Sequence, residues 1–595
     1  MEWELDQRAS ARYPLYSRAV VGDLCPDPVS PLTGSVGVGA ELGPAWAEAY
    51  AEAGLRPLPE QAAEPDPVLR FGGRMYLNTS LLRLFGTCAG GADPMAFARQ
   101  YLGERPDVPR QREERPSPDT STELLRSWTE RVLRGPGDSE EAQEHGRLAR
   151  RLTELQTTRP ELAGCTDAEL VARINGVRGE LRTALRRYVR AELATSVTAD
   201  LLTRATEDAG YPGITGALVA GTAGAITEGP FGQLYQLVRL VNRSEKLTAL
   251  FDQGLPAVLA QLESARNGDV GRLRSWLVAL RTRYGHQGPA EWELSADTCG
   301  TNPLVALAAL DVLRPVEHGP DPAERIRRQA EHSGATAGLV RRALDGSPRA
   351  TARFDAALAS TGGWLLARQR IRSACSALHH EQRLAARELG QRHVRGGLLD
   401  GVEQIFMLLG EELDEFVADP SQLAERLRMR AYDYYALGGY QPPYVTVGQP
   451  ASVVHWPNGS TARPLTGRGG LQGTAVSPGT GTGPAKLPRT PTAPGALRPG
   501  DVLVLPTAGP NWVPLLPIAA AVVVDNGAAL SDVAVACRDL GIPCVTATVE
   551  ATSRISEGVS VEVDGSTGIV RLVGVGSGAT PSRPMGAARP AHRSA

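Results

Sequence analysis

Histidine and carboxylate side chains gather in one short stretch of the chain, RTRYGHQGPAEWEL at residues 281–294. His286 lies in a glycine-rich turn, and Glu291 and Glu293 follow it closely. One imidazole and two carboxylates could transfer protons or bind a metal ion if they converge. The alternative is a solvated surface turn, which is the commoner setting for such residues. Arg281 and Arg283, just before the turn, could hold a phosphate or carboxylate group of a substrate.

A second candidate is the pair Ser531 and Asp532 in DNGAALSDVAVACRDLGIP, residues 525–543. The pattern predicts a glycine turn followed by a short helix. Both residues are good helix N-caps, and a capping carboxylate stabilises a helix by about 1 kcal/mol. Alternatively, burial could raise the carboxyl pKa of Asp532 enough for general acid or base work.

The remaining histidines of interest, His379, His380 and His393, lie in a long Arg-rich helical stretch. Their spacing is not that of a metal site, so a structural role is favoured.

Several domains must position these residues, because 595 residues exceed the size of a single hydrophobic core. Residues 1–105 form an irregular N-terminal segment, and apolar residues at helical spacing predict a mainly α-helical region at 123–437. A Gly/Pro/Thr-rich segment and linker is expected at 438–500. Strand and helix patterns then alternate over 501–575, as in a small α/β domain. Residues 576–595 should be a disordered tail. The sequence therefore predicts a multidomain α+β protein.

Composition excludes several partners. The formal net charge is -3 and 22% of residues are charged, which does not suggest nucleic-acid binding. Seven scattered cysteines fit neither a disulfide framework nor a structural zinc site. No signal peptide or membrane-spanning stretch is recognisable, so we expect a cytoplasmic protein that acts on a small molecule and binds neither nucleic acid nor membrane.

The C-terminal domain resembles the swivelling phosphohistidine domain of the phosphoenolpyruvate-utilising enzymes, which include phosphoenolpyruvate synthase and rifampicin phosphotransferase. The stretches that carry this resemblance are TAVSPGTGTGPA, LRPGDVLVLPTAGPNWVPLLPIAAAVVVDNGAALSDVAVACRDLGIPCVTAT and VEVDGSTGIVRL. Upstream, RTRYGHQGPAEWEL, GGLLDGVEQIFMLLGEEL, PVSPLT and RMYLN are similar to the central domain of the rifampicin phosphotransferase-like enzymes. The resemblance implies a helical substrate-binding region followed by a mobile swivelling domain.

Two departures from the family bear on function. The family places its carrier histidine directly after a serine, where this chain has Asp532. A carboxylate is anionic at neutral pH and repels a phosphoryl group, so ordinary phosphohistidine chemistry is not expected. An aspartyl phosphate would need a neutralising cation such as Mg²⁺. Nothing in the sequence resembles the family's ATP-grasp domain, and no nucleotide site is recognisable.

Three hypotheses follow. The first is an enzyme repurposed from this family for bacterial specialised metabolism, which uses Asp532, His286 and Glu291 for a lyase, cyclase or isomerase step. In it, Arg281, Arg283, Glu293 and Ser531 bind the substrate. The second is the acceptor-binding subunit of a two-chain phosphotransferase with a separate ATP-grasp protein. The third is a ligand-binding protein without catalysis.

Overall fold

A computed structural model of the chain describes residues 3–58, 66–90, 94–103, 105, 108–109, 117, 120–137, 139–221, 231–314, 322–457, 464–465, 469–488 and 497–573. The expected tail at 576–595 lies outside the described residues.

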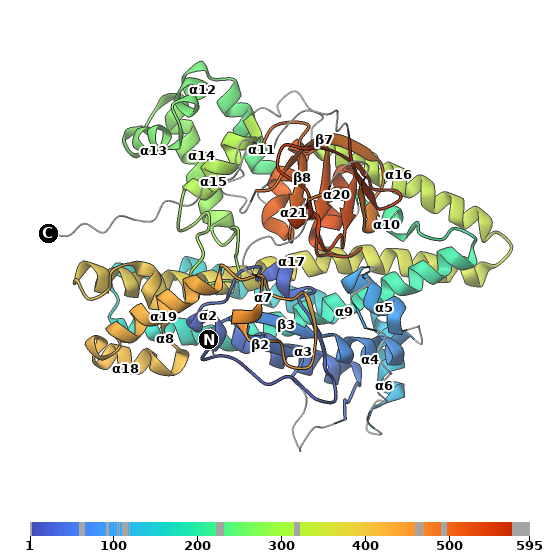
Figure 1. Ribbon diagram of the computed structural model, residues 1–595, viewed down its shortest axis with the longest axis horizontal. Helices are drawn as coiled ribbons and strands as arrows, with labels where there is room; N and C mark the ends of the chain where they lie inside the picture. The colour runs from blue at the N-terminus through green and yellow to red at the C-terminus, as the bar shows by residue number, and fades with distance from the viewer. Residues whose placement is uncertain are drawn as a thin grey trace.

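Two long helices form the centre of the molecule (Figure 1). They are α9 (Arg178–Asp208) and α17 (Pro348–Arg395), which pack along each other and bury an almost continuous row of side chains. Pro348 occupies the first turn of α17, where its fixed φ suits a helix start, and basic side chains fill the last turn beside the negative end of the helix dipole. The predicted mainly helical region is confirmed.

The other helices of this region surround the central pair (Figure 1). They are α1 (Val21–Leu24), α2 (Pro31–Val36), α3 (Val38–Ala53), α4 (Thr79–Gly90), α5 (Pro94–Leu102), α6 (Thr122–Leu133), α7 (Ser139–Thr157), α8 (Asp167–Gly176), α10 (Thr215–Leu218), α16 (Pro322–Ala343), α18 (Leu413–Ala418) and α19 (Ala424–Leu437).

A four-stranded antiparallel sheet lies in the N-terminal part, in the order β2 (Val68–Phe71), β3 (Arg74–Asn78), β1 (Leu15–Ser17) and β4 (Val445–Val447). Gly72 and Gly73 join β2 to β3 with positive φ at both positions, as a two-residue hairpin requires. Strand β4 comes from the segment expected to be a linker, so that segment begins as part of this sheet.

The C-terminal domain is built on an eight-stranded sheet in the order β5-β12-β11-β7-β8-β9-β10-β6. The strands are β5 (Gly470–Gln472), β6 (Thr474–Ser477), β7 (Thr480–Lys486), β8 (Val502–Leu505), β9 (Ala521–Val524), β10 (Cys544–Thr546), β11 (Ser560–Asp564) and β12 (Ile569–Leu572). Helices α20 (Asp532–Leu540) and α21 (Ala551–Arg554) complete the domain. The predicted α/β domain is confirmed, whereas the expected boundary at residue 501 falls between two strands of one sheet.

A cluster of smaller helices, α11 (Phe231–Asn242), α12 (Glu245–Asp252), α13 (Leu255–Ser264), α14 (Gly268–Tyr284) and α15 (Leu304–Leu313), stands beside the C-terminal domain (Figure 1). Its leucines share one buried core with the 3₁₀ segment Pro510–Ile518 and with α20. The C-terminal domain also rests on α17 and packs α20 against α16.

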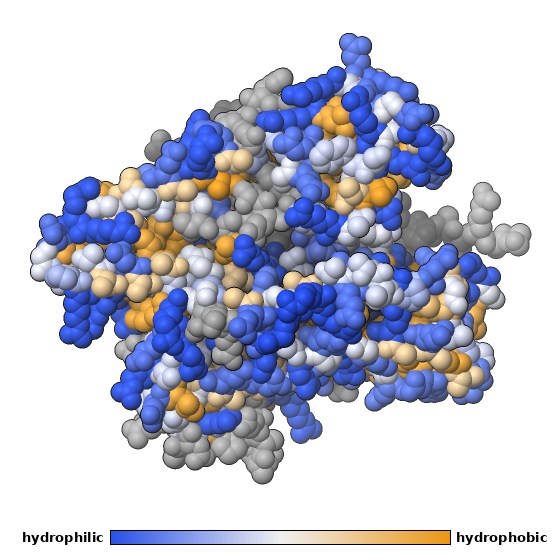
Figure 2. All heavy atoms as spheres, turned by 180° about the vertical axis from the view of Figure 1, so that it is seen from behind, coloured by the Kyte–Doolittle hydropathy of each residue, from blue (hydrophilic) through white to orange (hydrophobic). Residues whose placement is uncertain are grey.

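Hydrophilic side chains cover most of the face drawn in Figure 2, with hydrophobic ones in small groups between them. Among the described residues, no helix combines the length and hydropathy needed to cross a bilayer.

Candidate functional site

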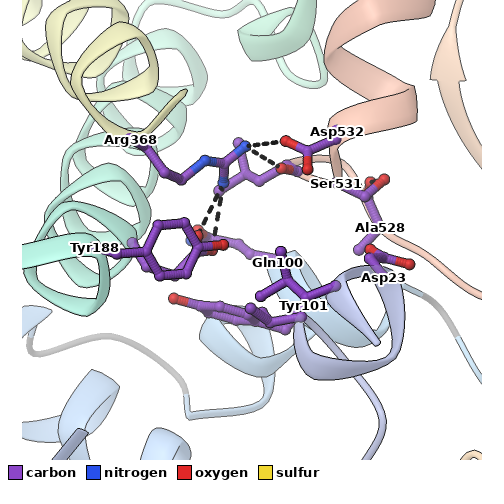
Figure 3. A pocket seen from close by; sticks show the side chains of 12 residues that line it. Asp23, Gln100, Tyr101, Tyr188, Arg368, Ala528, Ser531 and Asp532 are labelled. Carbon is purple, nitrogen blue, oxygen red and sulfur yellow. Dashed lines mark hydrogen bonds and ion pairs between the residues drawn. The ribbon is translucent and has the colours of Figure 1, made fainter. Parts of the chain in front are cut away.

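The first residue of α20, Asp532, is held by three side chains of the central helix α17. Its carboxylate accepts hydrogen bonds from Gln369 Nε2 at 2.6 Å, Arg372 Nη1 at 2.7 Å and Arg368 Nη2 at 3.4 Å. Ser531 is the N-cap residue, yet its hydroxyl donates to the Ala528 carbonyl instead of capping the helix. The contact between α20 and α17 is therefore an ion-pair clamp, and Figure 3 shows its Arg368 side.

Arg368 joins the clamp to a second long helix. Its Nη1 contacts both oxygens of Glu192 on α9, at 3.3 and 3.2 Å, and its Nη2 also donates to the Leu530 carbonyl at 3.0 Å. Arg368 and Glu192 are almost fully buried, each with 4% of its side chain exposed. One guanidinium therefore ties α9, α17 and the C-terminal domain together.

The clamp sets the ionisation of Asp532. Burial opposes ionisation, but the attraction of Arg372 and Arg368 outweighs it, so the carboxyl pKa lies below its ordinary value. Asp532 is therefore anionic at neutral pH and has no proton to give.

Glu291 lies on the other side of Arg372, with its Oε1 3.8 Å from Arg372 Nε. Burial raises the pKa of Glu291 above its ordinary value, against the pull of Arg372. His286 places its Nε2 3.0 Å from the Ser373 hydroxyl, and burial, followed by repulsion from Arg383, lowers its pKa to about 4. The imidazole is therefore neutral at pH 7. The structure brings three predicted residues, Asp532, Glu291 and His286, to one stretch of α17.

A pocket of about 390 Å³ opens beside these residues, between α7 and α17. This volume lies in the range of small-molecule sites. The described residues that line it are His145, Leu148, Ala149, Leu152, Thr153, Gln156, His286, Gln287, Gln369, Arg370, Arg372, Ser373, Ala374 and Ala377.

A smaller cavity of about 30 Å³ lies on the far side of Arg368, beneath α20 (Figure 3). It has room for one or two water molecules. Asp23 and Glu192 line this cavity together with Asp532. Loss of hydration, followed by repulsion from Asp532, raises the pKa of Asp23 to about 8.

The other predicted site residues lie apart from the clamp. Glu293 is buried, and its carboxylate accepts hydrogen bonds from the backbone N–H and hydroxyl groups of Ser30 and Ser295 and from the Thr33 hydroxyl. Arg281 and Arg283 are exposed near the end of α14, where Arg281 donates to the Gly300 carbonyl and Arg283 stacks on Tyr284. Substrate contacts for Glu293, Arg281 and Arg283 remain predictions.

The histidines of α17 have partners that account for them. His379 Nε2 accepts a hydrogen bond from the Val38 backbone N–H at 2.8 Å, and His393 Nε2 lies 3.2 Å from Asp167. No group of three or more His, Cys, Asp or Glu side chains suited to a metal ion occurs within the described part of the chain.

Two parts of the chain match known sequence families. Residues 497–568 match the mobile domain of phosphoenolpyruvate-utilising enzymes, and residues 184–365 match the fourth domain of rifampicin phosphotransferase. The chain is related to these enzymes. The first match contains strands β8–β11 with α20 and α21 and is called the mobile domain below, after the family it matches; the second match includes most of α9, α14 and the first part of α17. The clamp residues of α17, Arg368, Gln369 and Arg372, lie just beyond the end of the second match, whereas Glu192, which pairs with Arg368, lies within it.

Individual relatives agree with this relationship. An uncharacterised protein of Mycobacterium tuberculosis is 31% identical over 312 residues, which are 52% of this chain and 33% of the relative. An uncharacterised phosphotransferase of Bacillus subtilis is 28% identical over 33% of this chain and 24% of its own length. The phosphoenolpyruvate synthase of Aeropyrum pernix is 40% identical over 17% of this chain and 12% of its own length. The chain thus matches a third or less of the length of these relatives.

Sequence reasoning missed the residues that receive the mobile domain. Arg368, Gln369 and Arg372 lie in the stretch LARQRIRS, where two arginines four residues apart share one helix face. That spacing was the available signal for an anion-holding surface. Its partner, Asp532, lies far away in the sequence, and no local pattern connects the two.

Proposed function

We propose that this chain is an enzyme of phosphoenolpyruvate-utilising ancestry that transforms a small metabolite by proton transfer, without a phosphohistidine. The observation that carries the proposal is the ionised Asp532 held between Arg368 and Arg372. By resemblance, Asp532 occupies the position at which the family carries its phosphorylated histidine. A carboxylate there supplies permanently the negative charge that phosphorylation would supply transiently.

The proton-transfer groups of this proposal lie on the helical side of the clamp. In the ligand-free protein Asp532 orients Arg372 and stabilises its charge, and its lowered pKa leaves it no proton to donate. Glu291, whose pKa is raised, is the better general acid or base, and it lies behind the pocket wall, 3.8 Å from the lining residue Arg372. His286 lines the pocket as a neutral imidazole and can offer or accept a hydrogen bond at a substrate oxygen. These groups suit a lyase, cyclase or isomerase step, which needs positioning and proton transfer but no nucleotide.

The test is a search for turnover in the absence of ATP. Purified protein is incubated with a bacterial metabolite extract, and mass spectrometry follows which compounds are lost or gained. We expect one conversion that needs no nucleotide, and we expect Glu291→Gln to slow it about 100-fold or more. Glu331→Gln, at an exposed position of α16, is the matched control and should leave the rate unchanged. A conversion that requires ATP would contradict the proposal.

A second candidate is supported by the same arginines. Phosphorylation of Asp532 would need cations to neutralise the approaching phosphoryl group, and Arg368 and Arg372 are cations in contact with it. In this candidate an ATP-grasp protein supplies the phosphoryl group and the pocket holds its acceptor. Incubation with ATP labelled at the β-phosphate and candidate ATP-grasp proteins decides between the two. Hydroxylamine-sensitive label on Asp532 would favour phosphotransfer, whereas unlabelled protein favours the first proposal.

A further inference from the structure

The pocket between α7 and α17 has walls of contrasting character. Apolar side chains of both helices form one part of it: Leu148, Ala149, Leu152, Ala374 and Ala377. Neutral polar groups and two arginines form the rest, and no Asp or Glu is found among the described lining residues. An apolar wall with cationic and hydrogen-bond donor groups complements a molecule that has an apolar body and an anionic group.

Two of the donors in this pocket are the ones that hold Asp532. Gln369 and Arg372 both line the pocket and both donate to the Asp532 carboxylate, at 2.6 and 2.7 Å. Arg372 also has an unused donor, because its Nε is buried without a hydrogen-bond partner and lies 3.8 Å from Glu291 Oε1. A ligand in the pocket therefore contacts two of the side chains that hold Asp532 of the mobile domain.

We propose that this pocket binds an amphipathic anion, whose carboxylate or phosphate group competes with Asp532 for Gln369 and Arg372. The apolar body of the ligand packs against Leu148 and Leu152 of α7. This inference rests on the proposed substrate pocket and names the class of its ligand. Asp532 is then the internal occupant of the head-group site when no ligand is bound.

The charges around Arg372 allow the anionic group of a ligand to replace Asp532. Departure of Asp532 alone would leave Arg372 largely buried, with Glu291 as its nearest anion in the described structure, which is costly for a desolvated charge. An incoming anion restores the balance, while Arg368 keeps its ion pair with Glu192. Linkage requires that ligand binding weakens the contact between α20 and α17 by the same factor by which that contact weakens ligand binding.

Calorimetric titration of the full chain tests the ligand class with three probes: octanoate, octyl phosphate and octanol. We expect either anion to bind about tenfold or more tightly than octanol, and the two anions show which head group is preferred. Asp532→Asn removes the competing charge and should tighten anion binding about tenfold. Arg372→Gln should abolish the preference for anions. Arg387→Gln is the matched control, since Arg387 lies on the same helix but pairs with Asp297, and it should change nothing.

Several outcomes would overturn the inference: no binding of either anion, octanol binding as tightly as the anions, or unchanged affinity in Asp532→Asn. If circular dichroism shows that Arg372→Gln is unfolded, Gln369→Ala takes its place, and unchanged anion affinity in that variant counts against the inference. Hydrogen exchange gives a second readout, because octanoate should speed amide exchange at residues 531–535 of the wild type. None of these measurements depends on turnover, so failure here is distinguishable from failure of the proposed enzymatic activity.

Discussion

Asp23 shares a small cavity with two other carboxyl groups, Glu192 and Asp532, and Arg368, which also lines this cavity, is the cation that pairs with both of them. Loss of hydration on burial, followed by repulsion from Asp532, makes ionised Asp23 unfavourable in the folded protein and raises its pKa to about 8 from an ordinary value of 3.8. The protonated form is therefore the one compatible with the docked mobile domain at neutral pH.

The pH dependence of stability should reveal this group. A pKa raised by folding gives stability that is complete below about pH 4 and is lost progressively as pH rises to about 8. Asp23→Asn imitates the protonated form at every pH. In urea denaturation, the free energy of unfolding of the variant should rise relative to that of the wild type between pH 4 and pH 8, by a few kcal/mol in total. Above pH 8 the difference should stay constant. Asp27→Asn, at an exposed position, is the control. Parallel stability curves for Asp23→Asn and wild type would refute the assignment.

Glu293 gives a second prediction at this scale. Its buried carboxylate accepts hydrogen bonds from Ser30, Thr33 and Ser295, so it joins the loop after α14 to the start of α2. Glu293→Ala leaves these donors unpaired and should lower the free energy of unfolding by about 2–4 kcal/mol, measured by chemical denaturation. Glu331→Ala, at an exposed position, should cost less than about 0.5 kcal/mol. Equal effects of the two substitutions would show that the Glu293 contacts contribute little.

The sequence located some of the site and missed the rest for a physical reason. His286, Glu291 and Glu293 are close in the sequence, so their spacing was visible. The sequence did not show which of these residues faces the pocket, because that depends on packing against α17. Asp532 was identified through the family resemblance, whereas its arginine partners come from a helix more than a hundred residues away. Long-range ion pairs leave no periodic trace in a sequence.

At the scale of secondary-structure elements, the glycines of TAVSPGTGTGPA are required by close packing. A Cβ on Gly483 of β7 would lie 1.9 Å from the Gly500 carbonyl oxygen, and one on Gly481 would lie 2.2 Å from the Ala520 carbonyl oxygen. Backbone therefore passes these positions too closely for any side chain. From composition alone, such glycines indicate a linker, because a flexible linker and a close approach of two backbones both favour glycine.

The extent of the sheet can be tested with fragments. β7 lies inside the sheet, between β11 and β8, and it carries the pairing of both neighbours. A fragment of residues 501–573 lacks β5, β6 and β7, and we expect it to show no cooperative unfolding transition by circular dichroism. A fragment of residues 469–573 retains all eight strands and should show a cooperative transition, at lower stability than in the full chain because it lacks the α11–α15 side of the shared core. A cooperative transition in the shorter fragment would mean that β7 is dispensable.

Close packing at β7 leads to a point-mutation test in the full chain. Gly483→Ala forces a Cβ against the Gly500 carbonyl, so we expect a loss of about 1–3 kcal/mol in thermal or chemical denaturation. Gly558 also has open space for a Cβ, but its positive φ would strain an alanine, so Gly558→Ala is not a suitable control. Gly232→Ala is the matched control, since no atom lies within 4 Å of the added Cβ and the residue lies inside α11. A loss at Gly483 no larger than at Gly232 would contradict the close approach.

At the scale of the whole molecule, the mobile domain is not isolated from its neighbours. Leu515 and Leu516 belong to the same buried core as Leu307 and Leu310 of α15. The helices α11–α15 therefore stay with the mobile domain in any rotation that keeps this core intact. The loop between α14 and α15 carries His286 and Glu291 and is anchored to the central helices through Trp292, whose Nε1 donates to the Ser376 hydroxyl. A rotation of the mobile domain together with α11–α15 would therefore have to change the conformation of this loop, next to the proposed site.

The shared core predicts that the two parts unfold together. Leu310 is fully buried, so Leu310→Ala should cost about 2–5 kcal/mol through lost burial and the cavity left behind. Because the core is common to both parts, hydrogen exchange should speed up in α12–α14 and in α20 alike. Leu304 lies on the same helix with 36% of its surface exposed, and Leu304→Ala should have a much smaller effect in both places. If Leu310→Ala loosened α12–α14 and left α20 protected, the mobile domain would be an independent unit. The ion-pair clamp at Asp532 would then contribute more to the docking of the mobile domain than the shared core does.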